Sequence, residues 1–362
     1  VEVSVTSMPK LVPVTISELT VEVLNSYLED SEKWNKPLFK SIEISVPHGA
    51  LDGMSNAVRR IDGTLISGSK ARLIAKFRDK GGAENADQGG MNEVLFYREL
   101  ADVAGIESPE SYVALYDVDS NGMIIVLEHL DQGGSIGTIQ SYLDVPDVER
   151  IVVALAGMHA KWWNSVELAG LSQVRTFEEV MRGGAKLFAS GHYSGKRFIS
   201  RYGEHLHPDI YKMYDTPGQW GPKLQAGFSA NITLCNYDVA AKNLFLPNDP
   251  SQPPIFFDWS LLTRGNIGIE IAVVLAYCLR LEDHNRFPEI LNTYLEAMHN
   301  RGITDLTQQV LWNDFRHGLL VRMAAPIALT TRDYPPAHNL ALELLPRITS
   351  AVLESNALEL LD

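Results

Sequence analysis

The sequence predicts an α+β fold with a small β-rich N-terminal part and a larger, mostly helical C-terminal part. Before residue 128, short segments alternate polar and apolar residues, which is typical of half-buried strands in an antiparallel sheet. After Gly133-Gly134, apolar residues recur mainly at helical spacing as far as Leu361. We therefore expect two domains, residues 1–132 and 133–362.

The N-terminal domain is expected to begin with a helix and to continue as a sheet. Apolar residues at helical spacing predict the helix over residues 17–29. A loop over 81–90 and a second helix over 92–104 are expected between the third and fourth strands. The predicted strands are residues 41–46, 57–61, 72–77, 112–116 and 123–127.

The C-terminal domain is expected to be almost free of strands. A long helix is predicted over residues 145–163, and helical segments are expected to dominate from there to the end of the chain. The one exception is a short hairpin, predicted from the apolar residues 244–246 and 255–257 on either side of the turn at 247–250.

Length and charge restrict the possible functions. A chain of 362 residues can bury one large core or two ordinary ones. Its formal charge of −14 argues against a nucleic-acid binder, because phosphate backbones attract basic surfaces. The most apolar run, residues 269–279, is shorter than the ~20 residues of a membrane-spanning helix. The chain has only two cysteines, Cys235 and Cys278, and a protein of this size needs no disulfide for stability, so we expect a cytoplasmic protein. We expect no membrane partner.

The segment from residue 235 to residue 259 contains the most informative polar residues. Asp238 and Asn243 are five residues apart in a predicted loop, and Asp258 follows the second strand of the hairpin. Phosphoryl transfer needs an oriented nucleophile and a metal on the phosphates, and oxygen ligands of this kind suit Mg²⁺. Asn243 as a turn residue and Asp258 as a helix N-cap are the structural alternatives. The ordered set of all three favours a phosphoryl-transfer site.

The N-terminal domain offers a matching set for a nucleotide. Lys76 ends a predicted strand, where its ammonium could reach the α- and β-phosphates of ATP, and Glu93 on the next helix could hold it by an ion pair. The turn Gly53-Met54-Ser55-Asn56 could cover the phosphates with backbone N–H groups. A solvated lysine, a surface glutamate and a plain hairpin loop are the alternatives for these features.

The segment Glu128-His129-Leu130 joins the two domains directly after a predicted strand. Backbone groups of such a connection are suited to binding adenine, and ligands commonly occupy the space between two domains. His129 is given no catalytic role. His159, in a helix rich in small and aromatic residues, is expected to be a hydrogen-bonded packing residue.

Helical segments between about residues 162 and 227 are expected to line the site for the phosphate acceptor. Aromatic side chains there could form its walls. The candidates are Trp162, Trp163, Tyr193, Tyr202 and Trp220.

Together these residues resemble the aminoglycoside phosphotransferase and choline kinase superfamily, most closely its ecdysteroid-kinase-like (CHK) branch, over about residues 45–280. The resemblance implies a protein-kinase-like two-lobed fold, with Asp238 as the catalytic base and Asn243 and Asp258 as magnesium ligands. It also implies residues 53–56 as the phosphate loop, Lys76 and Glu93 as the N-lobe pair, and residues 128–130 as the hinge. The implied activity is ATP- and Mg²⁺-dependent phosphorylation of a hydroxyl group on a small molecule.

The chain departs from the family pattern in two places. Asn236-Tyr237 precede Asp238 where the family usually has His-Gly, and Glu270-Ile271 stand where it usually has Asp-Leu. The altered loop motivates an alternative, a pseudokinase that binds nucleotide or a partner without catalysis. A protein kinase is disfavoured because the G-x-G-x-x-G, H-R-D, D-F-G and A-P-E motifs are absent. Aminoglycosides, amino alcohols and steroid-like alcohols all stay open as acceptors, and the sequence does not predict the oligomeric state.

Overall fold

The structure is a computed structural model that describes residues 12–13, 15–47, 56–78, 87–120, 122–130, 132–180, 195–215, 227–330 and 335–361. The chain divides into two compact units. Unit 1 consists of residues 1–101 and 109–130, and unit 2 consists of residues 102–108 and 131–362. The short segment 102–108, placed in the N-terminal domain by the sequence, thus belongs to unit 2.

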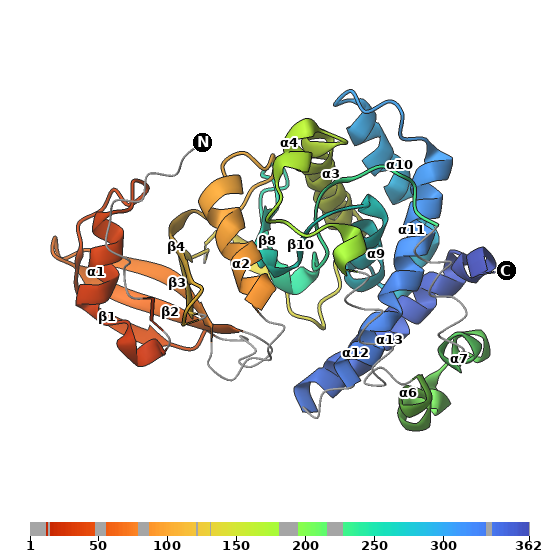
Figure 1. Cartoon of the computed structure of the whole chain (residues 1–362), viewed down its shortest axis with the longest axis horizontal. Coiled ribbons are helices and arrows are strands. Elements are labelled where there is room, and N and C mark those ends of the chain that lie inside the picture. Colours follow the sequence, from red (N-terminus) through yellow and green to blue (C-terminus); the bar gives the residue numbers. More distant parts are fainter. Residues whose placement is uncertain are drawn as a thin grey trace. The chain divides into compact units, whose positions relative to one another are not determined.

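Unit 1 is built on a five-stranded antiparallel sheet in the order β1-β2-β3-β5-β4, of which β1 to β4 are labelled in Figure 1. The strands are β1 (Phe39–Ser45), β2 (Asn56–Leu65), β3 (Lys70–Arg78), β4 (Ser111–Asp117) and β5 (Gly122–Glu128). The helical elements are η1 (Ile16–Glu18), α1 (Val21–Glu29), α2 (Asp87–Leu95) and the π-helical turn η3 (Phe96–Leu100). All five predicted strands are therefore confirmed.

Alternation of side chains gives this sheet one face in the core of unit 1. Along β3, every second residue from Ala71 to Phe77 is buried. Helix α1 begins after Thr20, whose hydroxyl accepts a hydrogen bond from the Val23 N–H, and it packs Leu24 into the same core. Because neighbouring residues of a strand point to opposite faces, the Lys76 side chain lies on the face of the sheet opposite to that of Phe77.

The second helix of unit 1 differs from the prediction. Helix α2 begins at Asp87, inside the loop expected over 81–90, and it passes into the π-helical turn η3 instead of continuing as one α-helix to residue 104. Gly89-Gly90 suggested a loop, but a Cβ atom on Gly90 would lie only 3.2 Å from the Met123 sulfur. Close packing against the sheet therefore outweighs the low helix propensity of glycine.

Unit 2 is mainly helical and contains two small antiparallel sheets, β6-β8-β9 and β7-β10. Its strands are β6 (Gly134–Ile136), β7 (Thr233–Asn236), β8 (Leu244–Pro247), β9 (Ile255–Phe256) and β10 (Leu262–Gly265). Its α-helices are α3 (Val145–Trp162), α4 (Val166–Gly170), α6 (Gly195–Tyr202), α7 (Pro208–Asp215), α9 (Ile267–Cys278), α10 (Phe287–His299), α11 (Gln308–Arg322), α12 (Ala324–Thr330) and α13 (Pro335–Glu354). The described residues of unit 2 also form short 3-10 turns: η4 (Gly203–His205), η5 (Ala241–Asn243), η6 (Trp259–Leu261), η7 (Leu281–Arg286) and η8 (Ala357–Leu361).

The predicted hairpin is confirmed as β8 and β9, but the expectation of almost no other strands after residue 134 is wrong. Strands β6, β7 and β10 were missed because each has only three or four residues. All four residues of β7 are buried, so it lacks the alternation by which a strand is usually detected.

Helix α9 is the centre of unit 2, and every one of its residues is buried. It begins at Asn266, whose Oδ1 accepts a hydrogen bond of 2.7 Å from the Gly268 N–H. It packs along α11 (Figure 1) at a crossing where Gly268 meets the Asp314 carbonyl and Gly318 meets the Gly268 carbonyl. A Cβ atom on either glycine would clash with backbone, so the close crossing requires both.

The helices of the described residues were also compared with the length and apolarity that a membrane span needs. None of them meets both requirements.

Candidate active site

The residues predicted to transfer phosphate lie in unit 2, on the loop between β7 and β8 and directly after β9. Strand β8 pairs with β9, and the Phe257 N–H continues this ladder by donating to the Asn243 carbonyl oxygen at 3.1 Å. The Asn236 side chain crosses to the Asp258 carbonyl oxygen at 3.0 Å. These hydrogen bonds bring Asp238, Asn243 and Asp258 into one site.

The Asn243 side chain is directed at Asp238. Its Nδ2 donates to the Asp238 carbonyl oxygen at 2.8 Å and to the Asp238 carboxylate Oδ2 at 2.9 Å. Both amide hydrogens are used in this way, which identifies the other atom, Oδ1 of Asn243, as the oxygen available for a cation.

The Asp238 carboxylate is held by one of its two oxygens. Oδ2 accepts hydrogen bonds from Asn243 and from the Lys242 ammonium, whose Nζ lies 2.7 Å away. In the described part of the chain, no donor reaches Oδ1. The carboxyl group is one-quarter exposed. A carboxylate that is fixed on one side and open on the other can accept a proton from a hydroxyl group.

Asp258 has a left-handed backbone conformation, with φ 61° and ψ 74°. Non-glycine residues rarely adopt it, and such strained residues cluster at functional sites. Its Oδ1 accepts a hydrogen bond of 2.8 Å from the Ser260 hydroxyl. Asp258 does occupy the N-cap position of η6, but its side chain makes no capping hydrogen bond there.

A buried network anchors the backbone ahead of Asp238. Oε1 of Glu270 accepts the Asn236 N–H at 3.0 Å, and Oε2 lies 2.8 Å from Nε2 of His159. Nδ1 of His159 lies 2.8 Å from the Tyr294 hydroxyl. His159 is therefore a buried, hydrogen-bonded packing residue, as expected, and Glu270 ties the start of α9 to the loop.

Cys235 lies within this network and has no sign of reactivity. Burial, and then the nearby Glu270 carboxylate, raise the pKa of its thiol well above the ordinary value, so the thiol stays protonated. His159, Cys235 and Glu270 are close enough to be considered as a metal site. Their polar atoms already bond to one another and to neighbouring groups, so the trio functions as an anchor.

The predicted N-lobe pair is formed within unit 1. The Lys76 ammonium lies 2.8 Å from Oε1 and 2.7 Å from Oε2 of Glu93, and the side chains are only 12% and 1% exposed. A solvated lysine and a surface glutamate are therefore excluded. Of the predicted phosphate loop, Gly53, Met54 and Ser55 lie outside the described residues, and Asn56 is the first residue of β2.

The predicted hinge residues end unit 1. Glu128 is the last residue of β5, and its N–H donates to the Glu110 carbonyl oxygen at 2.9 Å. Its Oε1 accepts the Glu110 N–H at 2.9 Å. His129 and Leu130 are half-buried. A nucleotide-binding role for these three residues stays a prediction.

Of the five aromatic residues predicted to line the acceptor site, two lie in the core of unit 2. Trp162 and Tyr202 are buried in unit 2, and Nε1 of Trp162 donates to the Ala104 carbonyl oxygen at 3.0 Å, so both belong to the core. Trp163 is half-buried. Tyr193 and Trp220 lie outside the described residues.

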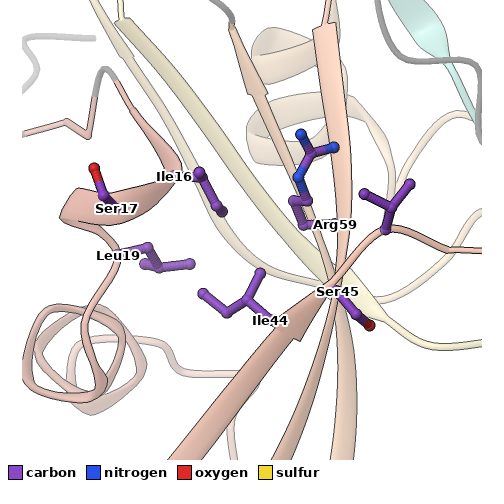
Figure 2. A pocket seen from close by; sticks show the side chains of 7 residues that line it. Ile16, Ser17, Leu19, Ile44, Ser45 and Arg59 are labelled. Atoms are coloured by element: carbon purple, nitrogen blue, oxygen red, sulfur yellow. The ribbon is translucent and has the colours of Figure 1, made fainter.

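A separate pocket of about 380 Å³ lies in unit 1, between η1 and the first two strands. Figure 2 shows the aliphatic side chains of Ile16, Leu19 and Ile44 beside Arg59 of β2. None of the predicted site residues lines this pocket.

Two contributors to the site were missed in the sequence. Lys242 was detectable in principle, because a lysine four residues after a carboxylate in a turn can fold back onto it. The bridging role of the Asn236 side chain depends on where the distant Asp258 lies, and a single sequence does not reveal this.

No protein-family model and no curated protein matches the chain. Solved structures do match it. The GDP complex of wild-type aminoglycoside 2'-phosphotransferase-IIIa matches with a TM-score of 0.54 and 13% identity, over 86% of this chain and 93% of that chain. An aminoglycoside-3'-phosphotransferase of type VIII has a TM-score of 0.51 and 18% identity, over 80% and 97%. The macrolide 2'-phosphotransferase of Brachybacterium faecium has a TM-score of 0.52 and 14% identity, over 84% and 94%. The chain has the fold of these phosphotransferases, which confirms the predicted α+β, protein-kinase-like fold.

Proposed function

We propose that the chain is an ATP- and Mg²⁺-dependent phosphotransferase that acts on a hydroxyl group of a small molecule. One observation supports this above the others. The Asn243 amide and the Lys242 ammonium hold Oδ2 of Asp238, which leaves Oδ1 of Asp238 for a proton and Oδ1 of Asn243 for a cation. The shared fold with solved phosphotransferases adds to the proposal.

Oxygen donors from Asn243 and Asp258 suit Mg²⁺, which takes few protein ligands and keeps several waters. A bound Mg²⁺ would supply positive charge to the β- and γ-phosphates. Lys76, directed by Glu93, would contact the α- and β-phosphates of the nucleotide.

In the proposed reaction, Oδ1 of Asp238 accepts the proton of the acceptor hydroxyl as its oxygen bonds to the γ-phosphorus. The bond from the γ-phosphorus to the bridging oxygen breaks, and ADP leaves with that electron pair. The products are a phosphate ester, ADP and one proton. The network of Asn236 and Glu270 keeps the loop in place during these steps.

The proposal includes three classes of acceptor. Solved structures with this fold are named for aminoglycosides and a macrolide, so polyhydroxylated antibiotics are the first candidates. Amino alcohols and steroid-like alcohols follow, the latter from the resemblance to the CHK branch. We place the enzyme in the cytoplasm, where two free, buried cysteines are expected to remain reduced.

The test is a screen of these alcohols for a mass gain of one phosphate group in the presence of Mg²⁺. ATP and GTP are used in parallel, since one solved neighbour was crystallised with GDP. The expected result is product with at least one acceptor for the native chain and none for Asp238→Asn. Binding of Mg–ATP without any product across the panel would instead favour the pseudokinase alternative.

A further inference from the structure

Lys242 lies on η5 between the proposed base and the proposed metal ligand. Its ammonium is 2.7 Å from Oδ2 of Asp238, and the two side chains are 27% and 25% exposed. An ion pair between partly exposed residues four positions apart contributes little to stability. Its place beside the proposed base, rather than its contribution to stability, is the basis for considering a functional role.

The reacting phosphoryl group has to come close to this ammonium. Oδ1 of Asp238 must be within about 2.6–3.2 Å of the acceptor oxygen to take its proton. That oxygen in turn starts about 3–3.5 Å from the γ-phosphorus. The Lys242 ammonium contacts the other oxygen of the same carboxylate, so it lies close to the place of the transferring group. Its four-carbon side chain is flexible, and the ammonium can therefore reach an oxygen of that group.

The charge of the site supports the same role. Asp238 and Asp258 bring two carboxylates, and the nucleotide adds further negative charge. Phosphoryl transfer depends on positive groups that offset charge on the transferring oxygens. Lys76 would act on the α- and β-phosphates and a bound Mg²⁺ on the β- and γ-phosphates, so a protein cation at the γ-phosphoryl oxygens would add to the charge that the metal supplies.

We propose that Lys242 is a further catalytic residue, which contacts the transferring γ-phosphoryl group. The inference rests on the proposed phosphotransferase function. No additional bond is made or broken: the proton still goes to Asp238, the electron pair still leaves with ADP, and the ammonium stabilises the phosphoryl oxygens between them.

The first test compares Lys242→Met and Lys242→Arg with the native enzyme. Removal of one such donor should lower kcat by about 10²-fold. The KM for ATP should change little, and Lys242→Arg should recover part of the rate. Lys212→Met is the control for the loss of a lysine charge, because Lys212 is exposed in α7 and lies 3.5 Å from Asp209. A kcat within about threefold of the native value would overturn the proposal.

A pH–rate profile separates this role from a simpler one. If Lys242 only kept Asp238 ionised, the rate of Lys242→Met would recover as the pH rises. Contact with the phosphoryl group predicts a loss of similar size between about pH 6 and 9, where a lysine ammonium stays protonated. Recovery of the variant to the native rate within that range would overturn the proposal.

A second readout needs no acceptor. Mg–ADP with aluminium fluoride imitates the transferring group, and it should raise the melting temperature of the native chain above the value with Mg–ADP alone. Lys242→Met should lose the increment from aluminium fluoride and keep the shift from Mg–ADP. If the variant keeps both, the Lys242 proposal fails and the phosphotransferase proposal stands. If the native chain shows neither, both proposals fail.

Discussion

The Asn236 side-chain amide donates to the Asp258 carbonyl oxygen at 3.0 Å, and its Oδ1 accepts the Asp238 N–H at 3.4 Å. One side chain thus links the backbone of the proposed base with that of the proposed metal ligand. The residue that departs from the family pattern at this position therefore braces the loop. The pseudokinase alternative was motivated by the altered residues before Asp238. Because Asn236 makes both of these contacts, the alteration is weaker support for that alternative.

Replacing Asn236 by aspartate should slow turnover. An aspartate keeps the size of the side chain but places an oxygen against the Asp258 carbonyl, so the bridge is lost. We expect kcat to fall by about 10–100-fold, because small displacements of reacting groups have effects of this size. Asn231→Asp is the control, since Oδ1 of Asn231 acts as an acceptor and aspartate preserves that bond. Native turnover by Asn236→Asp would contradict the bracing role.

Loss of the Lys76 ammonium should impair use of the nucleotide. Lys76→Met removes the positive charge that Glu93 holds, so the buried Glu93 carboxylate loses this ion pair. We expect kcat/KM for ATP to fall by at least about 10²-fold, together with lower stability in urea. Lys70→Met, which removes an exposed lysine on the same strand, should change neither quantity. Equal kinetics for the two variants would refute the assignment of Lys76.

Asp258→Asn should separate metal use from stability. Asparagine tolerates the left-handed conformation at least as well as aspartate, so the melting temperature should stay the same or rise. The Mg²⁺ concentration needed for half-maximal turnover should increase by about tenfold or more, because a charged ligand is lost. Asp249→Asn, which also has a serine two residues later as its partner, should keep the native Mg²⁺ response. If Asp258→Asn needed the same Mg²⁺ concentration as the native enzyme, the assignment of Asp258 as a metal ligand would be wrong.

Gly318→Ala should destabilise unit 2. Its Cβ atom would clash with the backbone of α9 at Gly268, so the helices must separate. Overpacking of this kind costs about 1–3 kcal/mol. Gly170→Ala, at the end of α4, meets no atom within 4 Å and should be neutral. The measurement is the free energy of unfolding in urea for both variants. If Gly318→Ala were as stable as Gly170→Ala, the crossing of α9 and α11 would not require glycine at position 318.

The free energy of unfolding should depend on pH through His284. Burial lowers the pKa of this imidazole from 6.5 to about 4. Between these pH values the unfolded chain binds a proton that the folded chain does not, so stability falls as the pH decreases through this window. The decrease should amount to about 2–3 kcal/mol. His284→Gln should flatten the curve below about pH 6.5 and run parallel to the native curve above about pH 7.5. A native slope in this variant would exclude His284 as the cause.

The parts of the fold that the sequence predicted are those with a local pattern. Strand β3 alternates regularly, so both its strand character and the position of Lys76 could be expected. Strand β7 is buried on both faces, and only its partner β10 makes it a strand. The bridge from Asn236 to Asp258 spans more than twenty residues, and no local pattern encodes it. The left-handed conformation of Asp258 has no signal in the sequence either, because aspartate is common in other conformations.

The backbone of Asp258 also sets a direction for evolutionary drift. At this position the conformation alone would favour glycine or asparagine over aspartate, by roughly 1 kcal/mol for glycine. If position 258 needed no carboxylate, glycine or asparagine would therefore be the more stable residue there. In relatives, we expect aspartate at this position where the proposed activity is kept, and glycine or asparagine where it has been lost.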